Sequence, residues 1–252
     1  MEKEFTTLFT GRKVVKLEET GSTNRFMNEL IQKEILPEGT VVIAGYQDSG
    51  QGLGGSKWFS EPGSNLLMSV VFRPEFLPVK KIYLVSKAIA LAIKDFLSEE
   101  GIHAKIKWPN DIYVDDGKIC GILIENSLRG NMVLQSVCGI GLNVNQKVFP
   151  SEIPNAVSMK LITGKTFSID ECRVKLCRQL EKRYLQIKAQ NFNLINNDYL
   201  KSLLRFYEMG VFEAGSEKFN AQIIDVEDEG KLVIKKENGS IHRFAFKEIK
   251  FL

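Results

Sequence analysis

The pattern of apolar and polar residues divides the chain into strands and helices of ordinary length. Apolar runs with strand periodicity lie at residues 12–18, 40–46, 65–73, 103–108, 112–115, 118–126 and 131–142. Apolar residues at helical spacing predict helices around 26–31, over 79–99, over 168–187 and over 194–207. Strands and helices mixed in this way predict an α/β or α+β body.

The pattern changes after Tyr207. Residues 210–252 contain short alternating strands, and Gly230 and Gly239 close two predicted turns between them. This is typical of a small all-β module. We therefore predict two domains, a catalytic body at residues 1–207 and an all-β C-terminal domain at residues 208–252.

The composition is that of an ordinary globular protein, with 44% hydrophobic and 26% charged residues. A net charge of +3 is too small to indicate nucleic acid or a membrane as the main partner. No apolar run approaches the roughly 20 residues of a membrane span. Residues 1–5 also lack the apolar core of a signal peptide. We therefore expect a cytoplasmic protein without a membrane or nucleic-acid partner.

Four cysteines occur, at positions 120, 138, 172 and 177, and no two of them form a C-x-x-C pair. With only two histidines in the chain, a structural zinc site is disfavoured. Reduced thiols in a cytoplasmic protein are the simpler interpretation.

A glycine-rich segment at residues 47–63 shows no hydrophobic period, and we predict a long functional loop there. Residues 50–55 match the G-x-G-x-x-G spacing of dinucleotide-binding proteins, but no helix is expected to open at Gly55. A surface loop would explain the glycines equally well. Alternatively, the loop orders over a phosphate-bearing ligand, because backbone N–H groups can hold an anion closely.

Two lysines flank a predicted turn in the middle of the chain. Lys-Trp-Pro-Asn-Asp occupies residues 107–111, and Lys118 precedes an apolar strand that ends at Glu125. Each residue alone has an ordinary explanation, since most lysines are solvated and Asn-Asp pairs usually form turns. Together, two lysines and a turn on adjacent strands suit a ligand with several negative charges.

These motifs resemble, in order, those of biotin–protein ligases. The central match joins residues 107–111 to residues 117–125, and further matches lie at 19–24, 46–66, 139–145 and 154–158. The resemblance covers nearly the whole chain. It implies an α+β fold, with a mixed β-sheet flanked by helices as in class II synthetases, followed by a small SH3-like β-barrel.

The resemblance implies a biotin–[acetyl-CoA-carboxylase] ligase. Such an enzyme forms biotinyl-5′-AMP and pyrophosphate from biotin and ATP, and then transfers biotin to a lysine of a biotin carboxyl carrier protein. Mg²⁺ is expected to be held mainly through the substrate phosphates. We expect a monomer or weak homodimer. Residues 1–21 are too few for the DNA-binding winged helix that some family members carry, so no repressor function is expected.

The resemblance also implies roles for single residues. Lys118 would bridge the biotin carboxylate and the α-phosphate, Lys107 would add positive charge, and Asp111 would guide the carrier lysine. The expected biotin-binding residues are Ser22, Thr23, Asn24, Gln47, Gly50, Gln51, Gly52, Leu53, Trp58, Lys118, Gly121 and Gly139. The expected ATP- or adenylate-binding residues are Gly52, Trp58, Asn110, Lys118 and Asn143.

The loop departs from the family pattern, which often has two arginines as Gly-Arg-Gly-Arg. This chain has Gln51 and Leu53 at those positions. Lys57 or backbone N–H groups could replace the lost charge. We expect biotinyl-AMP to leave this protein faster than an enzyme with the arginines.

Two alternatives accompany this interpretation. A lipoate–protein ligase of the same superfamily would perform the same chemistry on a related cofactor, but the loop at 47–58 and the short β-rich C-terminus favour biotin. A non-catalytic biotin-binding regulator is disfavoured because Lys107 and Lys118 are retained.

Overall fold

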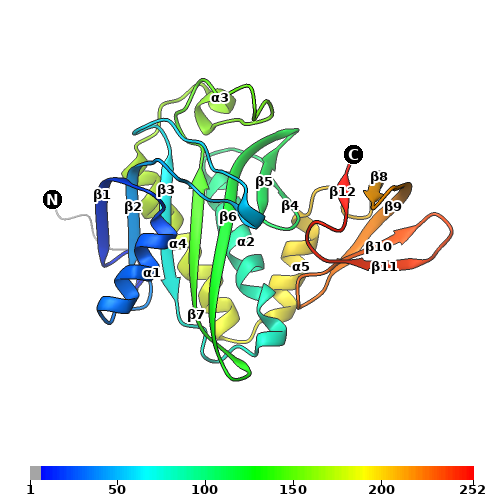
Figure 1. The fold of residues 1–252 in the computed structure, drawn as a ribbon, viewed down its shortest axis with the longest axis horizontal. Helices are drawn as coiled ribbons and strands as arrows, with labels where there is room; N and C mark the ends of the chain where they lie inside the picture. Colours follow the sequence, from blue (N-terminus) through cyan, green and yellow to red (C-terminus); the bar gives the residue numbers. More distant parts are fainter. Residues whose placement is uncertain (1–6) are drawn as a thin grey trace.

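The structure, a computed structural model, describes residues 7–252 and is built on a seven-stranded mixed sheet (Figure 1). The strand order is β1-β2-β3-β7-β6-β5-β4, with β1 and β2 parallel and the other pairs antiparallel. The strands are β1 (Val14–Thr20), β2 (Val41–Gln47), β3 (Leu66–Phe72), β4 (Lys105–Lys107), β5 (Asp111–Val114), β6 (Gly117–Arg129) and β7 (Met132–Leu142). Every predicted strand of the body is confirmed, with ends displaced by a few residues.

Helices cover both faces of this sheet (Figure 1). The helices are α1 (Thr23–Lys33), α2 (Tyr83–Glu99), α3 (Met159–Thr163), α4 (Ile169–Lys188) and α5 (Phe192–Ser202), with 3-10 turns η1 (Leu53–Gly55) and η2 (Val79–Lys81). The helices α2 and α4 pack together on one face, and α1 lies on the other. The predicted α+β class with a mixed sheet between helices is therefore confirmed.

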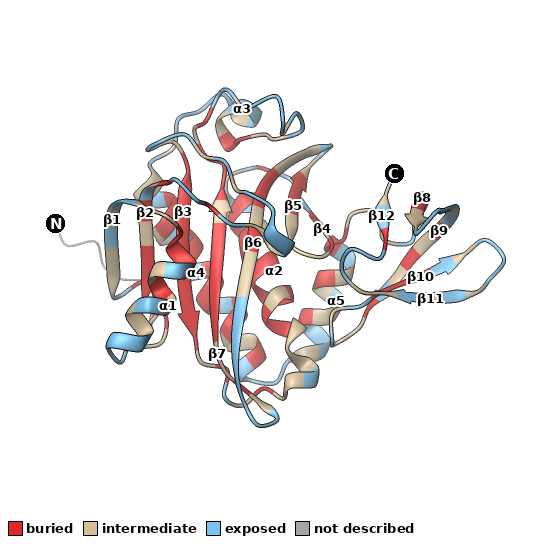
Figure 2. Ribbon diagram, in the orientation of Figure 1, coloured by how far each residue is buried: buried red, intermediate tan, exposed pale blue. Residues whose placement is uncertain are grey.

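Side chains of β3 point alternately to the two faces of the sheet, which explains why there are two hydrophobic clusters. Leu66, Met68, Val70 and Phe72 join the large cluster with α2 and α4, whereas Val71 packs with Met27 of α1. All residues of β3 are buried, as expected for a central strand covered on both faces (Figure 2).

One prediction about the segments outside the sheet was wrong. The helix predicted over 194–207 ends at Ser202, because the backbone of Leu204 turns away to donate a hydrogen bond to Ile106 O at 2.8 Å. Tertiary pairing with β4 thus overrides the helical pattern. The segment at 143–164 contains α3, whose first turn is capped by Ser158 Oγ accepting from Leu161 N at 3.2 Å.

The C-terminal part forms a separate antiparallel sheet with the order β11-β10-β9-β8-β12. Its strands are β8 (Met209–Ala214), β9 (Glu217–Val226), β10 (Leu232–Lys236), β11 (Ile241–Phe244) and β12 (Lys250–Phe251). The two predicted turns are present, and Gly230 and Gly239 adopt positive φ there. The expected closed barrel is corrected to an open sheet, since in residues 7–252 no ladder joins β11 to β12. The division into domains at 207/208 stays a prediction.

The C-terminal sheet is hydrogen-bonded to the body beside the Lys-Trp-Pro-Asn-Asp turn. Trp108 Nε1 donates to Gly230 O at 2.9 Å, and Lys87 of α2 donates through Nζ to Val226 O at 2.7 Å. Lys87 is buried, and burial lowers its pKa. These bonds fix the C-terminal sheet next to the turn that follows β4.

The four cysteines are buried and unpaired, and burial raises their pKa values, to about 11 for Cys172 and Cys177. Across residues 7–252 there is no helix with the length and apolar character needed to cross a membrane. The same range contains no group of three or more His, Cys, Asp or Glu residues placed to hold a metal ion. The signal-peptide prediction rests on residues 1–5, which lie outside the described residues.

Candidate active site

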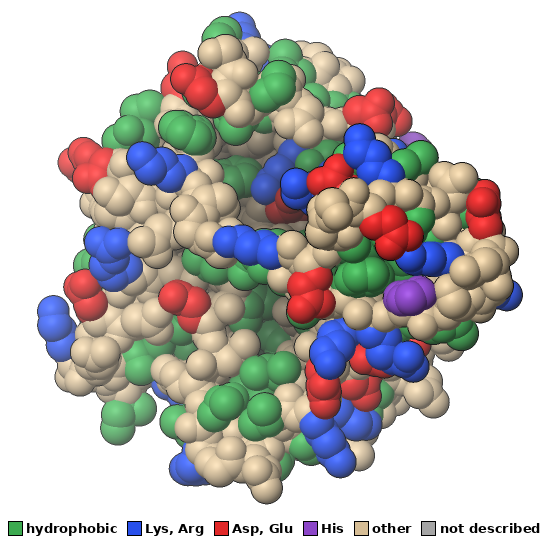
Figure 3. Space-filling view, turned by 45° about the vertical axis from the view of Figure 1, so that its right-hand side comes forward, with side chains coloured by type: hydrophobic (Ala, Val, Ile, Leu, Met, Phe, Trp, Pro, Cys, Tyr) green, Lys and Arg blue, Asp and Glu red, His purple; other side chains and the backbone are tan. Residues whose placement is uncertain are grey.

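A cavity of about 500 Å³ opens on the face of the sheet that carries α1. It lies between the start of α1, the glycine-rich loop, the turn after β4, the first half of β6, the end of β7, and the segment before β12. Figure 3 shows a hollowed face on which lysine and arginine side chains gather around the recess. The cavity is therefore assembled from segments that are far apart in the sequence.

The central charged feature of the cavity is a pair from adjacent strands. Lys118 Nζ lies 2.7 Å from Asp111 Oδ1, because β5 and β6 pair across the turn at Asp115. The contact is an ion pair between two partly buried side chains. The Lys118 ammonium also lies 5.6 Å from the centre of the Trp58 ring. A second anion entering the cavity would therefore meet a lysine that is already held in place.

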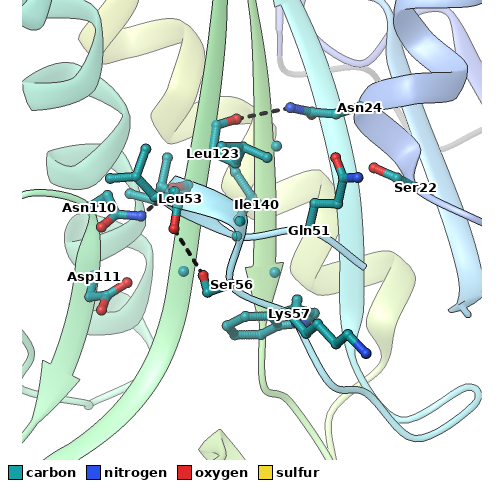
Figure 4. Close-up of a pocket in the computed structure, with 18 of the residues that line it drawn as sticks. Ser22, Asn24, Gln51, Leu53, Ser56, Lys57, Asn110, Asp111, Leu123 and Ile140 are labelled. Atoms are coloured by element: carbon teal, nitrogen blue, oxygen red, sulfur yellow. Dashed lines mark hydrogen bonds between the residues drawn. The ribbon is translucent and has the colours of Figure 1, made fainter. Parts of the chain in front are cut away.

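A polar corner forms where α1 begins. Gln47 Oε1 accepts hydrogen bonds from Thr23 N at 2.8 Å and from Thr23 Oγ1 at 3.1 Å. Ser69 Oγ lies 2.7 Å from Asn24 Oδ1, and Asn24 Nδ2 donates to Leu123 O at 3.1 Å (Figure 4). Because these groups fix one another, the corner presents hydrogen-bonding groups to a ligand in defined positions.

Glycines in β6 and β7 leave room for the Trp58 ring. A Cβ atom at Gly121 would lie 2.9 Å from the indole, and one at Gly141 would lie 2.5 Å from it. Gly139 is covered in the same way by the Asn24 side chain. Trp58 Nε1 is buried and has no hydrogen-bond partner among the described residues. The indole thus lines the cavity and retains an unused donor.

The glycine-rich loop has its own local structure. Trp58 N donates to Gly50 O at 2.9 Å, and Gly52 N donates to Ser56 O at 2.7 Å, so the loop folds back on itself. Its tip is η1, where Gly54 and Gly55 have positive φ. No helix opens after residue 55, which excludes the Rossmann geometry, as the sequence predicted.

Comparison with known proteins identifies the family. The model described as "Biotin/lipoate A/B protein ligase family" matches residues 17–143, half of the chain. The chain belongs to this ligase family.

Relatives of this ligase family match nearly the whole chain. The bifunctional ligase/repressor BirA of Bacillus subtilis is 31% identical over 242 residues, which cover 91% of this chain and 71% of that protein. The biotin–[acetyl-CoA-carboxylase] ligase of Mycobacterium tuberculosis is 29% identical over 223 residues, covering 86% and 80% of the two chains. The resemblance that the motifs indicated is confirmed.

The fold is shared with a solved member of the family. The biotin protein ligase of Aquifex aeolicus, solved in complex with biotin and ATP, superposes with a TM-score of 0.77 and 27% identity. The match covers 96% of this chain and 99% of that one. The second sheet is included in a match of this extent.

Most residues assigned from the family resemblance line the cavity. They are Ser22, Thr23, Asn24, Gln47, Gln51, Gly52, Leu53, Trp58, Asn110, Asp111, Lys118, Gly121 and Gly139. Asn110 Nδ2 donates to Ile122 O at 2.7 Å, which holds the turn against β6 (Figure 4). The structure therefore brings together residues from four motifs of the ligase family, although their individual roles stay predictions.

Three assigned residues lie outside the cavity wall. Lys107 Nζ lies over the Tyr113 ring, 4.6 Å from its centre, and burial lowers the pKa of this lysine. Asn143 is buried behind Lys118, and its Nδ2 donates to Val157 O at 3.1 Å. Gly50 lines a neighbouring cavity on the other side of the loop. Any contact of these residues with a ligand of the family is thus indirect in this conformation.

Sequence reasoning missed two residues of the wall that come from the C-terminal part. Phe246 and Lys247, in the turn before β12, line the cavity, and Lys247 Nζ donates to Gly54 O at 2.9 Å. No motif marks them, and 193 positions separate the two bonded residues. Gly141 was also missed as a cavity residue, although it lies within residues 139–145, one of the segments that match the family.

Proposed function

We propose that this protein is a biotin–protein ligase that makes biotinyl-5′-AMP from biotin and ATP. It then transfers biotin to a lysine of a biotin carboxyl carrier protein. The observation that carries the proposal is a single cavity lined by Lys118, Asp111 and the folded glycine-rich loop. Relatives named biotin–[acetyl-CoA-carboxylase] ligase, which this chain matches over most of their length, support it.

In the first step a carboxylate oxygen of biotin attacks the α-phosphorus of ATP, and pyrophosphate leaves. Both reactants are anions, so the reaction needs positive charge between them. Lys118 is placed to supply this charge, because its ammonium is held at the cavity wall by Asp111. Binding of a carboxylate or phosphate would replace Asp111 as the partner of Lys118.

Mg²⁺ fits this cavity mainly as an ion carried by the nucleotide. Asp111 is the acidic residue among those that line the cavity, and the described residues contain no cluster of three or more metal-ligating side chains. Mg²⁺ commonly binds through one or two carboxylates together with substrate phosphates. When bound, it would neutralise phosphate charge and assist the departure of pyrophosphate.

The second step needs a neutral amine and an exit for AMP. The neutral lysine Nζ of the carrier attacks the acyl carbon of the mixed anhydride. The bond between that carbon and the phosphate oxygen breaks, AMP leaves, and the attacking nitrogen loses a proton. Asp111 borders the cavity, and its carboxylate would be released from Lys118 when an anionic substrate takes that lysine as its partner. In this proposal the carboxylate orients the incoming amine and receives that proton.

The cavity also accounts for binding and protection of the intermediate. The polar corner of Thr23, Asn24 and Gln47 offers hydrogen-bonding groups for the ureido ring of biotin, and Trp58 offers an apolar wall. A volume of about 500 Å³ lies within the range for small-ligand sites. The folded loop covers this space, which would keep water from the labile anhydride.

The direct test is to incubate the pure protein with ATP, Mg²⁺ and a biotin carrier domain, with biotin or lipoate in parallel. The carrier mass is then followed. We expect addition of one biotinyl group in the biotin reaction, and no addition to a carrier whose acceptor lysine is replaced by arginine. Modification by lipoate alone, or by neither compound, would contradict the proposal.

We also infer where and in what form the enzyme acts. Four buried, unpaired cysteines suit a reducing cytoplasm. A monomer or weak homodimer without a nucleic-acid partner stays the prediction from the sequence. Light scattering and a mobility-shift assay with genomic DNA fragments would test these two expectations.

A further inference from the structure

Lys247 connects the C-terminal part of the chain to the tip of the glycine-rich loop. Its Nζ donates to Gly54 O at 2.9 Å, and a Cβ atom at Gly54 would lie 2.5 Å from Lys247 Cε. The loop backbone and the lysine side chain are therefore in close contact, and glycine at residue 54 leaves room for this approach. Lys247 lines the cavity together with its neighbour Phe246.

The backbone at Lys247 is in the left-handed region, with φ of 71°. For a residue with a Cβ atom this conformation costs roughly 1–2 kcal/mol, whereas glycine adopts it freely. A strained residue that is held at the edge of a cavity suggests a use for its side chain. The strain therefore points to the ammonium group of Lys247.

The charges along the cavity wall support such a use. The titratable side chains that line it are Lys57, Asp111, Lys118 and Lys247. Lys118 is already paired with Asp111, and Figure 4 shows Lys57 extending away from Asp111 and Asn110. Gln51 and Leu53 bring no charge to the loop. Lys247 is thus the cation that contacts the loop from outside.

We propose that Lys247 is a binding residue for the phosphate groups of the nucleotide, and that it replaces charge that the loop itself lacks. This inference rests on the proposed function. A lysine ammonium has three donors, and Gly54 O takes one of them. The other two are free to meet phosphate oxygens while the first keeps the loop tip in place. Lys247 therefore links nucleotide binding to closure of the loop.

The test uses Lys247→Met, which keeps most of the side-chain length but removes the charge, and Lys247→Arg, which keeps the charge. Lys250→Met is the matched control, since Lys250 is exposed on β12 and pairs with Glu213 at 3.3 Å. The measurements are the KM values for ATP and biotin in biotin-dependent exchange of pyrophosphate into ATP, and the rate of biotinyl-AMP release.

We expect Lys247→Met to raise the KM for ATP and the release rate by about tenfold, the effect of losing one charge-assisted hydrogen bond. The KM for biotin should stay near the wild-type value. Lys247→Arg should keep the KM for ATP and the release rate near the wild-type values. In the double variant with Lys247→Met and Leu53→Arg, release should be slow again. Lys250→Met should behave as wild type.

Unchanged KM for ATP and unchanged release in Lys247→Met, in a preparation whose wild type performs the exchange, would overturn the inference alone. Equal rises in both KM values, or a lower melting temperature with no selective effect on ATP, would also overturn it and indicate a structural role. Absence of exchange in the wild type would instead overturn the proposed function.

Discussion

The ammonium of Lys118 lies 2.7 Å from the carboxylate of Asp111, and both side chains remain partly exposed to the cavity. Partly exposed pairs contribute little to stability, commonly up to about 1 kcal/mol. The pair is therefore better explained by function than by stability. In the proposed function, the pair holds the lysine in position until an anionic substrate displaces the carboxylate.

The first prediction concerns Lys118→Ala. Because this residue is the cation held at the site of reaction, its loss should slow formation of biotinyl-AMP by at least about a hundredfold, as for loss of other transition-state donors. Single-turnover formation of labelled biotinyl-AMP measures the rate. Melting temperature checks the fold, since Asp111 loses its partner in this variant. Wild-type rates in Lys118→Ala would refute the assigned role.

The second prediction concerns the loop position that differs from the family pattern. Leu53→Arg places a cation at the tip of the loop, so biotinyl-AMP should leave about tenfold more slowly. Leu161→Arg on α3 adds the same charge at an exposed position outside the cavity and should leave release unchanged. The rate at which biotinyl-AMP leaves each variant, measured by filtration, distinguishes the two variants. Equal rates in wild type and Leu53→Arg would count against a charge deficit in the loop.

The third prediction concerns Gly141→Ala. The new methyl group would lie 2.5 Å from the Trp58 indole, so the ring must move away from the sheet. Overpacking of this kind typically costs about 1–3 kcal/mol. We expect a lower melting temperature, altered tryptophan fluorescence and weaker biotin binding by calorimetry. Gly210→Ala is the control, because its Cβ atom would make only ordinary contacts at 3.5 Å.

The fourth prediction concerns Lys107 and pH. Burial lowers the pKa of Lys107 below its ordinary value of 10.5, so the folded state binds this proton less tightly than the unfolded chain. The resulting penalty on folding is fully present at pH 7. It falls as the pH rises through the lowered pKa and vanishes above the unfolded value.

Lys107→Met should therefore unfold at slightly higher urea concentration than wild type at pH 7, and this advantage should shrink at pH 10. The same variant should form biotinyl-AMP more slowly if Lys107 adds positive charge near the phosphates. A stability difference that grows with pH would contradict the assigned effect of burial.

The sequence predicted the body of the fold because its signals are local. Strand and helix periodicity located the seven strands and the long helices α2 and α4, and the glycines at 121 and 139 marked close contacts on the sheet. The helix expected to continue to Tyr207 failed because pairing of Leu204 with Ile106 is a tertiary effect. The open form of the second sheet could not be predicted, because closure into a barrel depends on pairing between distant edge strands.

Sequence motifs predicted those parts of the cavity wall that belong to them. Lys118, Asp111 and Trp58 were found because they belong to recognisable segments, and the structure places them on one wall. Lys247 was not found, since a single lysine in a turn has no distinguishing pattern and its partner Gly54 lies 193 positions away in the sequence. Lys107 and Asn143 were assigned to the site because they belong to motifs, but they lie behind the cavity wall. Membership of a motif therefore does not by itself place a side chain in the cavity.

The central claim is that this cavity activates biotin with ATP, and isotope exchange tests it without a carrier protein. The wild-type protein is incubated with Mg²⁺, ATP and labelled pyrophosphate, with biotin, lipoate or neither. The account predicts label in ATP only when biotin is present. Exchange that needs lipoate, that proceeds without either acid, or that does not occur with biotin would contradict it.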